Sequence, residues 1–443
     1  MSEPLRDAEV RQDLMVRLAE ARARTDELIG LLRPDALYDR PIPERHRSIF
    51  YLGHFEAFDW NLVCRGAFGS EPFHDSFDQL FAFGIDPVGG DLPADTPSDW
   101  PSIPEIEEYN RTVRESVDEC LRDFSLSAPS HPALEGGAIF HLAIEHRLMH
   151  AETFAYLLHQ MPLSKKILQP GSPRPAVPSP APCVVEIAAG SATLGLVRQE
   201  SFDFGWDNEF DPQSVDVGAF RIDAQNVTNG DFLKFIGSGA YDDRALWTRP
   251  DWEWKTSQEI THPGFWLLQG EDWYWRTMFA EIPLPLDWPA YASHAEASAY
   301  AHWRGKALPT EAQFHRAAYG THEGRERAYP WGDEAPGVCH GNFNFQLRDP
   351  TSVGAYPAGR SGFGLDDLVG NGWEWTSTLF EPFSGFQVFP LYPRYSANFF
   401  DGKHYVAKGG SPFTAACMLR RSFRNWFQPH YPFVYAAFRC VER

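Results

Sequence analysis

The chain lacks the cysteine spacing on which disulfide scaffolds and zinc ribbons depend. Only six cysteines occur among 443 residues, they are dispersed, and there is no C-x-x-C pair. The sequence therefore excludes both a disulfide-bonded scaffold and a zinc ribbon, and we expect the cysteines to be reduced thiols. At roughly 100 to 200 residues per domain, the length predicts two or three domains, each large enough to bury its own core.

Positive charge and long apolar runs are also scarce. The 39 Lys and Arg residues face 60 Asp and Glu residues, which gives a formal net charge of −21. A surface this acidic repels phosphate backbones and anionic lipids, so neither nucleic acid nor a membrane is an expected partner. No run reaches the roughly 18 apolar residues of a membrane helix, and the N-terminus lacks a basic start followed by an apolar core. These features predict a cytoplasmic protein.

A proline-rich segment divides the chain. Residues 169–182 read QPGSPRPAVPSPAP, in which six prolines remove the N–H groups that helices and sheets need. We predict a linker there, between a helical domain over 1–168 and a second domain over 183–443. No fixed-period repeat is found.

The first domain has the apolar spacing of amphipathic helices. The predicted helices cover about 14–32, 47–65, 106–124 and 132–160. Four such helices predict an antiparallel bundle, whose interior is a common place for metal sites. The Pro-, Gly- and Asp-rich stretch over about 68–104 is predicted to be a long loop near one end.

The second domain has a different texture, with short aromatic runs separated by Gly, Pro, Asn and Asp. Two short helices are predicted, over about 294–303 and 310–319. Thr310 is the expected N-cap of the latter, and Glu311 favours its dipole. The remainder predicts an irregular α+β domain with an aromatic core.

Two histidines in EHRLMHAE are the first candidates for chemistry. His146 and His150 lie four apart on one predicted helix face, together with Ile139 and Leu142, so both rings should point inward. A buried polar group without a hydrogen bond or a metal costs about 1 to 3 kcal/mol. A zinc protease needs Glu directly after the first histidine, but Arg147 stands there. Chance spacing of two histidines is the competing interpretation.

His54 in SIFYLGHFEAFDW is the strongest candidate for a third ligand, because apolar residues flank it within a predicted helix. Three neutral imidazoles leave positions open for substrate and O2, and they suit Fe, Cu, Ni and Zn alike. Glu56, Glu145 and Glu152 are candidate acceptors for the ligand N–H groups, with solvated helix residues as the alternative.

Several segments of the chain carry a family resemblance. The first domain resembles the DinB-like helical bundle, and the second resembles the formylglycine-generating-enzyme (sulfatase-modifying factor) fold, which is related to C-type lectins. The segments are NVTNGDFLKFI, ASAYAHWRGKALPTEAQFHRAA, YPWGDE, GNGWEWT, KGGSPF and FRNW…AAFR. The resemblance implies an α+β fold in which most of these Trp and Gly residues form core and turns.

The fusion of the two domains resembles the EgtB/OvoA/SenA family of ergothioneine-type sulfoxide synthases and selenoneine synthases. This resemblance implies a non-haem Fe(II) enzyme that uses O2 to join a thiol or a selenium donor to the imidazole ring of hercynine (trimethylhistidine). His54, His146 and His150 match the three iron ligands of the family. The choice of iron comes from the resemblance and not from the histidine count.

The closing motif departs from that of the members that use γ-glutamylcysteine, in which basic residues follow RNWD. Here RNWFQPHYPF keeps Arg424, Asn425 and Trp426 but places Phe427 and Tyr431 at the charged positions. These five residues are the candidate substrate-binding residues. Without these charges the ion-pair recognition of a zwitterionic thiol is lost. Aromatic and hydroxyl groups favour a sugar, so we expect a seleno-sugar donor and selenoneine synthesis.

Another basic segment of the family is replaced by residues 86–102, which contain no Arg or Lys. The alternative is a sulfoxide synthase that uses γ-glutamylcysteine or cysteine, with charge recognition moved to Arg420 or Arg421.

The resemblance also assigns contacts to hercynine. Asn425 and Trp426 match the residues that hold its quaternary ammonium, a group bound by aromatic faces and oxygen dipoles. Met149 stands where ergothioneine enzymes commonly have Gln. The segment FPLYPRYSANFF contains two candidates for the catalytic tyrosine of the family, Tyr392 and Tyr395. Tyr395 is expected in the core, and the proton donor stays unassigned.

Two further functions compete with this interpretation. A copper-dependent formylglycine generator needs a close pair of cysteines near the C-terminus, whereas Cys417 and Cys440 are 23 residues apart. The second competing function is that of a non-catalytic, lectin-like binding module whose helical bundle is degenerate. Three histidines kept in register argue against it.

Overall fold

The computed structural model describes residues 3–83, 92–125, 131–169, 180–197 and 204–443, and the chain forms two compact units. The first contains the described residues of Met1–Gln169 together with Phe204 and Pro390–Tyr392, and the second contains the others. Residues 170–179 of the predicted linker and 86–91 of the predicted donor segment lie outside the described residues.

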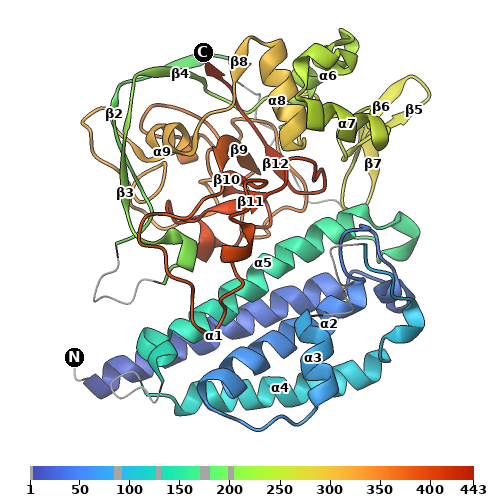
Figure 1. Ribbon diagram of the computed structural model, residues 1–443, viewed down its shortest axis with the longest axis vertical. Helices are drawn as coiled ribbons and strands as arrows, with labels where there is room; N and C mark the ends of the chain where they lie inside the picture. The colour runs from blue at the N-terminus through green and yellow to red at the C-terminus, as the bar shows by residue number, and fades with distance from the viewer. Residues whose placement is uncertain (1–2, 84–91, 126–130, 170–179, 198–203) are drawn as a thin grey trace. The chain divides into compact units, whose positions relative to one another are not determined.

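Helices build the first unit (Figure 1). They are α1 (Glu3–Ile29), α2 (Ser48–Asp59), the π-helix η2 (Trp60–Ala67), α3 (Asp75–Phe83), α4 (Ile103–Asp123) and α5 (Ala138–Gln160). The four predicted helices are confirmed, because α1, α2, α4 and α5 bury the apolar faces that the spacing identified. In α4, Glu105 accepts the backbone N–H of Ser102 at 2.9 Å, which satisfies one amide at the start of the helix.

The prediction of a long loop over 68–104 is wrong in part, because α3 forms within it. Phe77 and Phe81 lie one turn apart in α3, and Phe81 is fully buried. The Asp78 carboxylate accepts hydrogen bonds from the Trp60 indole at 3.0 Å and from the Tyr109 hydroxyl at 2.8 Å. The surrounding Pro, Gly and Asp residues obscured this short apolar face.

Short strands and helices build the second unit. Its sheets have the strand orders β1-β4-β13-β8, β11-β10-β9-β12, β2-β3 and β5-β6-β7. The strands are β1 (Val184–Ile187), β2 (Gly190–Leu194), β3 (Gln213–Val217), β4 (Phe220–Asp223), β5 (Trp266–Gln269), β6 (Asp272–Arg276), β7 (Glu281–Pro283), β8 (Lys306–Ala307), β9 (Gly372–Leu379), β10 (Tyr405–Gly410), β11 (Asn425–Phe427), β12 (Ala436–Ala437) and β13 (Val441–Glu442). The helices are α6 (Asn229–Gly237), α7 (Arg249–Ser257), α8 (His294–Trp303) and α9 (Glu311–Tyr319).

The second unit confirms the predicted α+β class with an aromatic core. Trp266, Trp275, Trp373 and Trp375 are each at most 1% exposed. Both predicted helices are present as α8 and α9, and Thr310 caps α9 by accepting the Gln313 N–H at 3.1 Å. In the described part of the chain, no helix combines the length and the apolar character needed to cross a membrane.

Candidate functional site

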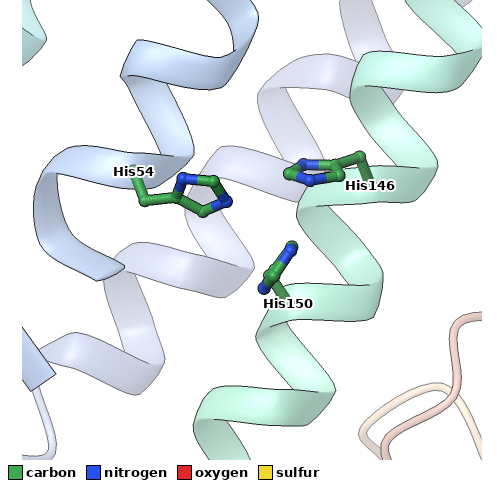
Figure 2. Close-up of side chains that lie close together, drawn as sticks. All are labelled: His54, His146 and His150. Atoms are coloured by element: carbon green, nitrogen blue, oxygen red, sulfur yellow. The ribbon is translucent and has the colours of Figure 1, made fainter. Parts of the chain in front are cut away.

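Two neighbouring helices bring the three predicted histidines together. His54 projects from α2, and His146 and His150 project from successive turns of α5 toward it (Figure 2). One nitrogen of each ring lies within 4.8 Å of the others. Two imidazole nitrogens on one ion are at most about 4.2 Å apart, twice the zinc–nitrogen distance, so a small closure of the rings would suffice.

The hydrogen-bonding state of the ring nitrogens is compatible with a metal site. The His54 Nδ1 donates to the main-chain carbonyl of Phe81 at 2.6 Å, which leaves Nε2 as the acceptor nitrogen. The His146 Nε2 and the His150 Nδ1 are buried without a hydrogen-bond partner. Since buried polar atoms are nearly always paired, these two orphaned nitrogens fit a metal-binding site.

Burial keeps the three rings neutral. It lowers the pKa of His54 to about 4, despite the hydrogen bond to Phe81 that favours the charged form. Burial also holds the pKa values of His146 and His150 well below their ordinary range, and repulsion from a neighbouring histidine adds to the effect. Neutral imidazole is the form that binds a metal ion, so the cluster needs no deprotonation near pH 7.

Aromatic rings hold the histidines in place. Phe58 stacks on His146 with ring centroids 3.3 Å apart, and Phe50 stacks on His54 at 4.6 Å. Tyr392 lies edge-on to His146 at 5.6 Å. These contacts restrict rotation of the His54 and His146 rings.

A cavity of about 270 Å³ opens beside the cluster, and His54, His150 and Tyr392 form part of its wall. Arg45 and Glu44 add one permanent cation and one carboxylate to the lining. Sequence reasoning did not identify Arg45 or the Phe81 carbonyl, and it left Tyr392 unassigned. No spacing rule connects these groups to the histidines.

Arg147 ties the two ligand helices together. Its fully buried guanidinium donates to the Glu56 carboxylate at 2.7 and 3.0 Å, to Asp59 at 2.7 Å and to the Phe55 carbonyl at 2.9 Å. Burial raises the pKa of Glu56, but Arg147 and Arg114 outweigh this and bring it down to about 2. Glu56 is therefore an ion-pair partner of arginine, and its predicted role as an acceptor for a ligand N–H is wrong.

The other two candidate carboxylates, Glu145 and Glu152, are 2% and 8% exposed. They are not the solvated helix residues that formed the alternative interpretation.

The missing side chain at Gly53 leaves room for Phe81, whose carbonyl accepts the hydrogen bond from His54. A Cβ atom at this position would lie 2.5 Å from the ring of Phe81, whose carbonyl orients His54. Because Phe81 is fully buried, Gly53→Ala is expected to displace it and to weaken metal binding at the histidine cluster about 10- to 100-fold. Competition with a chelator measures the affinity. Gly237→Ala, at a helical glycine with open space around it, serves as the control, and equal affinities in both variants would contradict the prediction.

In the second unit, Arg424 precedes an aromatic edge strand. Only 2% exposed, its guanidinium meets both Glu311 carboxylate oxygens, at 2.9 and 3.1 Å, and donates to the Glu381 carbonyl at 3.0 Å. It also lies 4.1 Å from the centroid of the Phe383 ring. These contacts fix the start of β11, and the positive charge of Arg424 is paired with Glu311 inside the protein.

Asn425, Trp426 and Phe427 form β11, which pairs with β10 and lies at the edge of its sheet. Trp426 stacks on Phe380 with centroids 4.2 Å apart, and Phe427 and Tyr431 stack at 6.5 Å. All four predicted contact residues on this strand and its following loop are half-buried, so each keeps an accessible part.

Tyr395 belongs to the core, as expected from the sequence. It is 7% exposed and stacks on Trp206 with centroids 3.9 Å apart.

A buried lysine supports the same region. The Lys408 Nζ donates to the carbonyls of Arg421 and Phe423, at 2.9 and 2.6 Å, and burial lowers its pKa from the ordinary 10.5 to about 8. Between these two values the unfolded chain binds a proton that the folded chain does not, so the free energy of unfolding should rise with pH.

The part of this rise in the free energy of unfolding that is due to Lys408 should total about 3 kcal/mol between pH 8 and 10.5. The Lys408→Met variant should not show it. Denaturant unfolding of both proteins across this window gives the difference directly. Parallel pH profiles would show that Lys408 does not titrate in this way.

Cys440, one of the two cysteines considered for the rival formylglycine mechanism, is poorly suited to it. Cys440 is fully buried, and burial raises the pKa of its thiol far above the ordinary value. A protonated, inaccessible thiol is neither a nucleophile nor a copper ligand.

Comparison with known proteins identifies both parts of the chain. Residues 170–443 match the sulfatase-modifying factor enzyme 1-like domain, and residues 17–154 match the DinB superfamily.

Some relatives align with this chain over almost its whole length. A protein of Mycobacterium tuberculosis named hercynine oxygenase is 32% identical over 452 residues, which cover 97% of this chain and 98% of the relative. Its namesake from Mycolicibacterium smegmatis is 35% identical, with 95% and 96% covered. Ergothioneine biosynthesis protein 1 of Neurospora crassa is 29% identical, over 93% of this chain and 55% of that protein.

Proposed function

Because this chain belongs to the hercynine oxygenase family, an oxidoreductase family, we propose that it joins a chalcogen donor to the imidazole ring of hercynine with O2. Fe(II) held by His54, His146 and His150 would supply the redox chemistry of this coupling. The observation that carries the proposal is the convergence of three neutral imidazoles, with two orphaned nitrogens, in a chain aligned along nearly the whole length of these relatives.

The chain's own residues provide binding, orientation and proton transfer. We assign the carboxylate of hercynine to Arg45, the permanent cation of the cavity. For its trimethylammonium group we keep Asn425 and Trp426, which the family resemblance assigns. Two tyrosines line the cavity, Tyr51 and Tyr392. Tyr51 is only 2% exposed, whereas Tyr392 is half-buried and lies edge-on to His146, so we assign to the Tyr392 hydroxyl the proton that the reaction transfers. Arg424 acts as a positioning residue, since its guanidinium is committed to Glu311.

Charge pairing favours a neutral donor over a charged dipeptide. Arg420 pairs with Glu209 at 2.8 Å and Arg421 with Glu326 at 3.0 Å, so the two arginines that could replace the missing basic residues are already neutralised. Two arginines of the first unit are likewise already paired: Arg47 donates to the Asp95 carboxylate at 2.8 Å, and Arg40 pairs with the same carboxylate. We therefore propose a seleno-sugar donor packed against Phe427 and Tyr431, and thus selenoneine synthesis in the cytoplasm.

The names of the relatives favour a sulfur donor, so γ-glutamylcysteine or cysteine is the alternative. A direct assay separates the two: iron-loaded protein receives hercynine, O2 and one of the three donors, and product formation is followed by mass spectrometry. We expect the seleno-sugar to react at least about 10-fold faster than either thiol, because it brings no charge that lacks a partner. Faster turnover of γ-glutamylcysteine would overturn the selenium assignment and leave the hercynine assignment intact.

A further inference from the structure

Two cysteines that are distant in the sequence meet inside the first unit. Cys64 lies on η2 and Cys120 on α4, 56 residues later, and their sulfur atoms are 3.6 Å apart. Cys64 is fully buried and Cys120 is half-buried, and both are free thiols. We propose that Cys64 and Cys120 are a modification site, at which a small disulfide oxidant closes a reversible disulfide between η2 and α4. This inference does not depend on the proposed function.

The geometry needs little change to form the bond. A disulfide holds its sulfur atoms about 2.05 Å apart, so the two thiols must approach by about 1.5 Å. η2 packs directly on α4, so the two elements that carry the cysteines are neighbours, and the proposal requires only that rotation of the two side chains brings the sulfur atoms together. The four remaining cysteines show no such thiol–thiol contact in the described part of the chain.

The two thiols differ in accessibility, as a reactive and a resolving cysteine require, because Cys120 is half-buried and Cys64 is fully buried. Contact with Cys64 lowers the pKa of Cys120, whereas contact with Cys120 and burial raise the pKa of Cys64. Arg22 is a nearby buried cation that favours the Cys64 thiolate, while Asp59 opposes it.

The exchange balances without any further reagent. The Cys120 thiolate attacks one sulfur of the oxidant, breaks its disulfide and releases one small thiol. The Cys64 thiolate then attacks the Cys120 sulfur of the mixed disulfide and releases the second small thiol. The two protein thiols are oxidised, the oxidant is reduced to two thiols, and the protons of Cys64 and Cys120 pass to these products.

Oxidised glutathione and the full-length protein test the proposal. After incubation, peptide mapping without reductant should find the Cys64 and Cys120 peptides cross-linked, and dithiothreitol should separate them. The cross-link should raise the temperature of thermal unfolding by about 5 to 10 °C, because it closes a long loop in the unfolded chain. Cys120→Ser should lose both effects, and Cys183→Ser, at an exposed thiol, should keep both.

Glutathione retained on Cys120 beside a free Cys64 thiol would overturn the proposal, as would two unmodified thiols after prolonged oxidation. Mapping of the unsubstituted protein decides between these outcomes even if the Cys120→Ser variant fails to fold.

Discussion

Replacing His150 by alanine is expected to reduce bound iron to a small fraction of one ion per chain and to lower activity at least about 100-fold. Loss of a hydrogen bond that supports a ligand lowers metal affinity about 10- to 100-fold, and loss of the ligand itself should lower it further. His54→Ala and His146→Ala should behave alike, because the three nitrogens lie within 4.8 Å of one another and serve one ion. Iron per chain is measured by elemental analysis.

Two further variants sharpen this test. His141→Ala removes a histidine from the same helix but outside the cluster, so it should keep its iron. His150→Asp replaces an imidazole with a carboxylate and so creates the two-histidine, one-carboxylate set typical of other non-haem iron sites. We expect this variant to bind iron more tightly than His150→Ala does. Stoichiometric iron in all three alanine variants of the cluster would refute the metal site.

The second large effect is expected at Arg147. Arg147→Ala should lower the free energy of unfolding by about 3 to 5 kcal/mol, because it removes the arginine that pairs with the buried Asp59 carboxylate and leaves Glu56 with Arg114 alone. Arg111→Ala provides the matched control, since Arg111 pairs with Glu108 on an exposed helix surface and should cost less than about 1 kcal/mol. Denaturant titration of the helical signal measures both values.

Arg147→Ala should also weaken iron binding, for a reason separate from stability. The Arg147 guanidinium links α5, which carries two of the histidines, to Glu56 and Asp59 on α2, which carries the third. Without this link the helices can shift relative to each other by more than a metal site tolerates. Iron titration at a temperature where the variant remains folded separates this effect from unfolding, and unchanged affinity there would show that Arg147 acts on stability alone.

Periodicity was sufficient to predict the elements that carry the histidines. Because His146 and His150 share a helix face with Ile139 and Leu142, an inward orientation could be predicted before any coordinates, and the structure confirms it. His54 was selected as a candidate ligand from its apolar neighbours in a predicted helix, and the family resemblance then matched it to a ligand position. Spacing within one helix contains no information about a partner almost a hundred residues away.

Other features were beyond the reach of sequence patterns. The acceptor for His54 is a main-chain carbonyl, at Phe81, and backbone atoms have no residue signature. Arg147 entered the sequence argument only as the residue that excludes a protease, and its ion pairs depend on the packing of α5 against α2. The contact of Cys64 with Cys120 likewise follows from helix packing, so dispersed cysteines in the sequence were compatible with adjacent thiols in the fold.

The short segment Pro390–Tyr392 has a consequence for the evolution of such fusions. It belongs to the helical unit although nearly all of its sequence neighbours belong to the other one, and Tyr392 completes the wall of the histidine cavity. A recombination event that exchanged the first 169 residues between two relatives would pair one parent's histidines with the other parent's tyrosine. Selection should therefore favour joint inheritance of both halves, and chimaeras split at the proline-rich segment should recover activity only when residues 390–392 travel with the helices.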